Sequence, residues 1–97
     1  MRKLDASDDR ALVLEENHLA ALRWGAEQNR FPLSELKETP GEVTRDDKGK
    51  TLGVFGKKEE RVRIWFGRLA LAVWVPLERQ DEAESFVAEA NAAIERA

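Results

Sequence analysis

The feature that most constrains the fold is a pair of alternating segments, residues 61–66 and 69–75, joined by Gly67-Arg68. Side chains of a strand point to opposite faces in turn, so each alternating segment is typical of a half-buried strand. Glycine takes positive φ at little cost, and Gly67-Arg68 therefore fits a two-residue type II′ turn. We expect an antiparallel hairpin here.

A two-residue loop also sets the register of that hairpin. One face is expected to oppose apolar pairs only, namely Phe66 with Leu69, Ile64 with Leu71 and Val62 with Val73. The other face is expected to oppose Trp65 with Ala70, Arg63 with Ala72 and Arg61 with Trp74. The apolar face is the expected core face.

A helix is predicted over residues 81–96. Apolar residues recur there at three- and four-residue spacing, which places them on one helical face: Ala83, Phe86, Val87, Ala90 and Ile94. Asp81 and Glu84 have the spacing of a capping box, and Pro76 separates the helix from the hairpin. This amphipathic helix is expected to cover the apolar face of the hairpin.

The middle of the chain reads as short elements over residues 29–37, 42–45 and 51–56. Turn-forming residues lie between them, at 39–41 and at 46–49, where Gly, Pro and Asp supply the necessary backbone angles. This spacing indicates a meander of short antiparallel strands.

Residues 8–25 fit two structures. As a helix, the stretch begins at Asp8 or Asp9, ends at Gly25 and is rich in Ala, Leu and Glu. As a hairpin, residues 11–15 and 19–24 pair around residues 16–18, with Asn17 in positive φ. Local propensity favours the helix.

The order of these pieces resembles bacterial pleckstrin-homology-like (PH-like) domains. The resemblance rests on residues 11–25, on Arg30-Phe-Pro-Leu-Ser-Glu-Leu36 as a further strand, and on 51–56, 61–75 and 81–96. It implies an α+β fold: a bent antiparallel sheet or partly open barrel capped by one C-terminal amphipathic helix. It also favours the hairpin for residues 8–25. Inositol-lipid-binding members carry Lys and Arg between their first two strands, whereas residues 15–18 are Glu-Glu-Asn-His, so lipid binding is not carried over.

Size and composition narrow the function classes. A chain of 97 residues makes one domain, expected over residues 10–97 after a flexible N-terminus of residues 1–9. Lys and Arg number 16 against 19 Asp and Glu, which disfavours nucleic acid as a partner. There is no cysteine, the first residues lack the apolar run of a signal peptide, and residues 69–77 are too short to span a bilayer. A cytoplasmic protein is expected.

Candidate catalytic and metal-binding residues are few. His18 is the single histidine, and its neighbours Glu15 and Glu16 without an evident pocket fit a surface turn better than acid–base chemistry. Residues 46–49 lack the alternating ligands of an EF-hand, and the glycines at 49, 53 and 56 lack Walker spacing. We therefore expect no cofactor, no metal and no enzymatic activity. Trp24, with Phe31 and Phe55, is expected to fill the core.

The Arg/Trp face, made of Arg61, Arg63, Trp65 and Trp74 on the second face of the hairpin, is the candidate interaction surface. Trp and Arg are enriched in interface hot spots, and opposed Arg61 and Trp74 can form a cation–π contact. Alternatively, the N-terminal part of the chain covers this face, or the Arg stems shield the indoles. The expected function is a non-enzymatic interaction module that binds a protein partner or a second copy of itself. A peripheral membrane module that binds anionic lipid, and a small enzyme or substrate-binding subunit with an interface pocket, are the alternatives.

Overall fold

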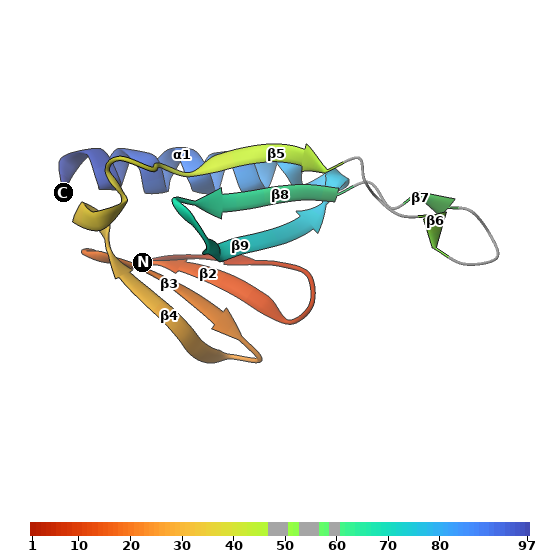
Figure 1. Cartoon of the computed structure of the whole chain (residues 1–97), viewed down its shortest axis with the longest axis horizontal. Coiled ribbons are helices and arrows are strands. Elements are labelled where there is room, and N and C mark those ends of the chain that lie inside the picture. Colours follow the sequence, from red (N-terminus) through yellow and green to blue (C-terminus); the bar gives the residue numbers. More distant parts are fainter. Residues whose placement is uncertain (47–50, 53–56, 59–60) are drawn as a thin grey trace.

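The computed structural model describes residues 1–46, 51–52, 57–58 and 61–97, which form two antiparallel sheets and one long helix (Figure 1). The first sheet has the order β1 (Arg2–Asp5), β2 (Arg10–Leu14), β3 (His18–Arg23), β4 (Ala26–Pro32). The second has the order β5 (Glu42–Asp46), β8 (Arg61–Phe66), β9 (Arg68–Pro76). The remaining elements are the strand pair β6 (Thr51–Leu52) and β7 (Lys57–Lys58), the 3-10 turns η1 (Leu33–Leu36) and η3 (Leu77–Arg79), and α1 (Gln80–Arg96).

The core lies between the inner faces of the two sheets and α1, which runs along β5 and β8 in Figure 1. The predicted α+β fold with a C-terminal helical cap is confirmed, and the sheets do not close into a barrel. The helix buries the face that was predicted: Ala83, Phe86, Val87, Ala90 and Ile94. Helical periodicity identified these residues because they meet a single continuous core.

Residues 8–25 are a hairpin of β2 and β3, which confirms the structure that the resemblance favoured over local propensity. The hairpin buries Leu12 and Leu19 completely, and this tertiary burial outweighs helix propensity. The prediction of positive φ at Asn17 is wrong. Among the described non-glycine residues, positive φ occurs instead at Asp8, Asp9 and Trp24.

Residues 1–9 were expected to be flexible, but part of this segment forms a strand. Arg2–Asp5 pairs with β2 as strand β1, and Leu4 is 1% exposed within the core. The alternation of Leu4 with Lys3 and Asp5 was too short a pattern to predict a strand. The loop between the first two strands is therefore residues 6–9 and not residues 15–18 as predicted. Like residues 15–18 it is acidic, because it carries Asp8 and Asp9.

The hairpin of β8 and β9 is confirmed, but its predicted register is wrong, by two residues at Arg63 and Ile64 and by one at Phe66, which lies opposite Arg68. Ile64 lies opposite Val73, and Arg63 lies opposite Trp74. Only Gly67, with φ of 46°, separates the strands, and an irregularity between Ile64 and Phe66 takes up the difference. A slip of two residues preserves the faces, so the apolar side still lies in the core.

Two further predictions are wrong in detail. Residues 33–36 form η1 and continue no strand, because a 3-10 turn brings both Leu33 and Leu36 into the core at three-residue spacing. The predicted capping box is absent: η3 leads directly into α1, whose N-cap is Arg79 without a side-chain hydrogen bond. The strand predicted over 51–56 is described only at Thr51–Leu52, and Phe55 lies outside the described residues.

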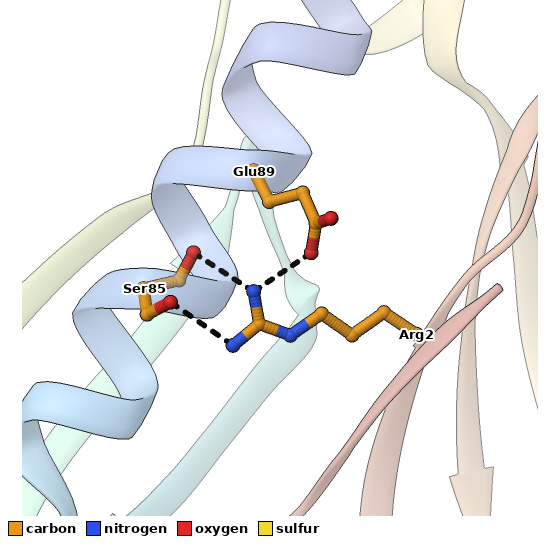
Figure 2. A network of polar contacts seen from close by, with 3 residues as sticks. All are labelled: Arg2, Ser85 and Glu89. Carbon is orange, nitrogen blue, oxygen red and sulfur yellow. Dashed lines mark hydrogen bonds and ion pairs between the residues drawn. The ribbon is translucent and has the colours of Figure 1, made fainter.

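Two polar clamps hold α1 to the strands. The side-chain amide of Asn91 accepts from the Gly41 N–H at 2.7 Å and donates to the Gly41 carbonyl at 3.0 Å. At the other side of the helix, Arg2 of β1 donates to Glu89 at 2.7 Å and to the hydroxyl of Ser85 at 3.1 Å (Figure 2). These clamps fix the helix against β1 and against the segment that enters β5.

Candidate interaction surface

The Arg/Trp face lies on the outer side of the second sheet, away from the core. Arg63 is opposite Trp74 on β9 and opposite Thr44 on β5, so these three side chains share this side. Arg61 and Trp65 lie two residues before and after Arg63 on β8 and point the same way. All four side chains of the face are half-buried.

Each arginine of this face lies over an indole ring. The Arg61 guanidinium carbon is 5.2 Å from the centre of the Trp74 ring, and that of Arg63 is 5.6 Å from the centre of the Trp65 ring. The contact of Arg61 with Trp74 is diagonal, because Arg61 itself lies opposite Pro76. These cation–π contacts hold the four side chains against the sheet.

Two donors on this face are buried without an acceptor among the described residues: Nε of Arg63 and Nε1 of Trp65. A buried donor that lacks a partner costs about 1–3 kcal/mol. Both atoms lie on the same strand, two residues apart, on one side of the sheet. Because both atoms are already buried within the single chain, an acceptor from another chain reaches them only when the Arg63 and Trp65 side chains shift on binding.

The N-terminal part of the chain reaches the edge of this face. The Ser7 N–H donates to the carbonyl of Trp74 at 2.7 Å, which attaches the loop between β1 and β2 to the free edge of β9. Ala72, on the same side of β9 as Trp74, is 7% exposed. The face is therefore a packed surface rather than four loose side chains.

A cavity of about 200 Å³ lies at the same edge of β9. It is lined by Arg10, Ala21, Leu22, Arg23, Gln28, Asn29, Ala72 and Val73. Polar side chains of the first sheet thus meet the strand that carries Trp74. The cavity is formed where the two sheets meet, so no local pattern in the sequence predicted it.

Trp24 is an exposed residue that the sequence analysis wrongly assigned to the core. It is 72% exposed and occupies, with Gly25, the two-residue turn between β3 and β4. Both residues have positive φ, at 52° and 76°, as a type I′ turn requires. The indole N–H donates to Asp9 at 3.0 Å, and Arg23 lies over the ring at 4.5 Å. The Trp-Gly dipeptide was the available signal, but it indicates a turn only after the two strands are recognised.

Among the residues considered for acid–base chemistry, the Glu15 carboxylate is engaged by an arginine and not by His18. The Glu15 carboxylate is bound by Arg30 at 2.8 Å, and the Glu15 backbone N–H donates to the His18 carbonyl at 2.8 Å. The guanidinium of Arg30 also binds Glu27, and the hydrogen bond to Glu27, with both carboxylate charges, raises the pKa of Arg30. Within the described part of the chain, no three His, Asp or Glu side chains gather as a metal ion requires.

Comparisons with protein-family models, with curated proteins and with solved structures found no match to this chain. Among residues 1–46, 51–52, 57–58 and 61–97, no helix has both the length and the apolar character needed to cross a membrane.

Proposed function

We propose that this chain is a non-enzymatic interaction module of the PH-like type, whose Arg/Trp face binds another protein chain. The observation that carries the proposal is the pair of buried donors, Nε of Arg63 and Nε1 of Trp65, that have no acceptor among the described residues. A partner that shifts these side chains on binding supplies the missing acceptors, and Arg and Trp are among the residues that most often dominate the binding energy of protein interfaces.

The order of elements supports the PH-like part of the proposal. The resemblance implies antiparallel strands followed by a C-terminal helical cap, and the chain has a four-stranded sheet, a three-stranded sheet and a C-terminal helix in that order. The acidic loop at residues 6–9 argues against an inositol-lipid ligand, because Asp8 and Asp9 repel anionic headgroups. A protein ligand is therefore preferred to a membrane.

A partner protein fits this face better than a second copy of the chain. A two-fold symmetric dimer places the same patch on itself, so Arg61 and Arg63 of one chain would face the same arginines of the other. Like charges brought together in an interface are unfavourable. A partner that presents carbonyl or carboxylate groups meets no such cost.

Affinity capture from the source cells tests the proposal. We expect the set of proteins held by the wild-type chain to be lost with Trp65→Ala, because truncation of a hot-spot Trp weakens binding by about thirtyfold or more. Arg63→Gln should act in the same direction, whereas Arg96→Gln, which removes an exposed charge at the end of α1, should leave capture unchanged. Circular dichroism checks that each variant is folded. Equal capture by wild type and Trp65→Ala would contradict the proposal.

A further inference from the structure

The cavity at the free edge of β9 has an unusual wall of like charge. Arg10 and Arg23 are directly opposed on β2 and β3. They continue the row of Leu12 and Ala21, so they lie on the inner face of the first sheet, at the end where the core stops. Gln28 and Asn29 of β4 complete this polar wall.

Opposed like charges destabilise a strand pair unless something between them compensates. In the described part of the chain, neither arginine is bound to a carboxylate. Two acids close to this pair in sequence or register bind other side chains: Asp9, next to Arg10, accepts from the indole of Trp24 at 3.0 Å, and Glu27, opposite Leu22, binds Arg30 at 2.7 Å. Both arginines line the cavity; the Arg23 guanidinium also lies over the Trp24 ring at 4.5 Å, and neither charge has an acid paired with it.

We infer that this cavity binds a carboxylate of an acidic segment of the partner protein. The inference rests on the proposed function and specifies the chemistry of the partner. A carboxylate is matched by guanidinium groups, which donate in the same plane as its two oxygens. A cavity of about 200 Å³ holds an Asp or Glu side-chain head with its bridging waters. Since Ala72 lines the cavity and lies two residues from Trp74, a chain bound on the Arg/Trp face can reach it.

An acidic peptide suits the cavity better than a membrane surface. Asp8 and Asp9 directly precede Arg10 in the loop before β2, and the chain carries a net charge of -3. A negatively charged bilayer would approach these acids over a wide area, whereas a single carboxylate meets only the arginines.

Nuclear magnetic resonance titration of the whole chain with acetyl-tetraglutamate-amide tests the inference. We expect saturable shifts of the Arg10 and Arg23 Nε–H signals, and no shifts with acetyl-tetraglutamine-amide. Arg10→Gln and Arg23→Gln should each weaken binding about tenfold, because each removes charge-assisted hydrogen bonds. Arg96→Gln is the matched control and should change the affinity less than twofold.

Other outcomes contradict the inference. Equal weakening by Arg96→Gln would show non-specific charge attraction, and shifts produced by inorganic phosphate or by phosphatidylserine vesicles, but not by the peptide, would assign the cavity to another ligand. The proposed function is tested separately: Trp65→Ala should abolish partner capture while leaving the peptide titration unchanged, and capture that survives Trp65→Ala would overturn the proposed function. Partner capture that needs Trp65 but survives Arg10→Gln and Arg23→Gln would overturn the cavity inference alone.

Discussion

At the scale of single residues, Asn91 shows how one side chain can replace a strand partner. Its amide bonds both the N–H and the carbonyl of Gly41, at 2.7 and 3.0 Å. Glycine is also the only residue type that fits at position 41, since an added Cβ would overlap the ring of the buried Phe66. The connection into β5 is therefore held by one amide and one close contact.

Asn91→Ala should lower the free energy of unfolding by about 2 kcal/mol, because it leaves two partly buried backbone groups of Gly41 without partners. Urea unfolding followed by circular dichroism measures this. Asn17→Ala, at an exposed position, should cost less than about 0.5 kcal/mol. Similar losses for the two variants would show that the clamp contributes nothing.

The ion pair of Glu82 with Arg79 predicts how the stability of the fold changes with pH. Arg79 donates to both its carboxylate oxygens, at 2.9 and 3.0 Å, and these hydrogen bonds, with the charge of Arg79, lower the pKa of Glu82 from its ordinary value of 4.5. The pair therefore stabilises the fold above the unfolded pKa of Glu82, and this contribution disappears as the pH falls through the lowered folded pKa. Arg79→Gln should raise the pKa of Glu82 towards 4.5 in a carboxyl carbon-13 titration, while Arg96→Gln leaves it in place. An unchanged Glu82 pKa in Arg79→Gln would refute the assignment.

At the scale of elements, strand β1 makes the N-terminal residues part of the fold. Leu4→Ala should destabilise the protein by about 2–5 kcal/mol, as expected for a fully buried leucine. Lys3→Ala changes an exposed side chain of the same strand and should cost less than about 0.5 kcal/mol. If the first residues were flexible, as the sequence indicated, denaturant unfolding would give near-zero changes for both.

Helix α1 is attached mainly through its apolar face, where Phe86 is completely buried. Phe86→Ala should lower the free energy of unfolding by about 3–5 kcal/mol with an unchanged denaturant slope. Ala88→Ser, on the exposed side of the helix, is the control. A small effect of Phe86→Ala would mean that the two polar clamps, and not the core, hold the helix.

Sequence patterns predicted the elements whose burial is periodic. The buried face of α1 and the apolar face of the hairpin were found because each has a regular spacing that a single core imposes. The hairpin register was not found, since the alternation of apolar residues does not record the irregularity between Ile64 and Phe66. The turn at Leu33–Leu36 was missed because a four-residue 3-10 segment has too few repeats to establish a period.

The sequence predicted which residues form the Arg/Trp face, but not which of their donors lack acceptors or where a cavity lies beside it. Arg61, Arg63, Trp65 and Trp74 share one side under either register, because a slip of two residues preserves the alternation of faces. Which donors lack acceptors, and where a cavity forms, depends on how β9 meets the first sheet. These properties arise from contacts between segments far apart in sequence, which a single pattern does not record.

At the scale of the whole molecule, the two sheets divide the chain into a covered and an uncovered side. The inner faces and α1 bury one another, so the stability of the fold comes from one core. The outer side of the second sheet carries the Arg/Trp face, with the arginine-lined cavity at the edge of β9. The fold thus presents one surface on which aromatic, cationic and unsatisfied polar groups lie together.

Photo-cross-linking in the source cells tests that surface most directly. A photoreactive amino acid placed at Thr44, which lies opposite Arg63 on this side of the sheet, should form a covalent adduct with a partner protein under light. The same group at Glu84, on the exposed side of α1, should form none. An adduct at Thr44 that disappears with Trp65→Ala is the predicted result. Absence of an adduct at Thr44, or equal adducts at Thr44 and Glu84, would contradict the assignment of the Arg/Trp face as the binding surface.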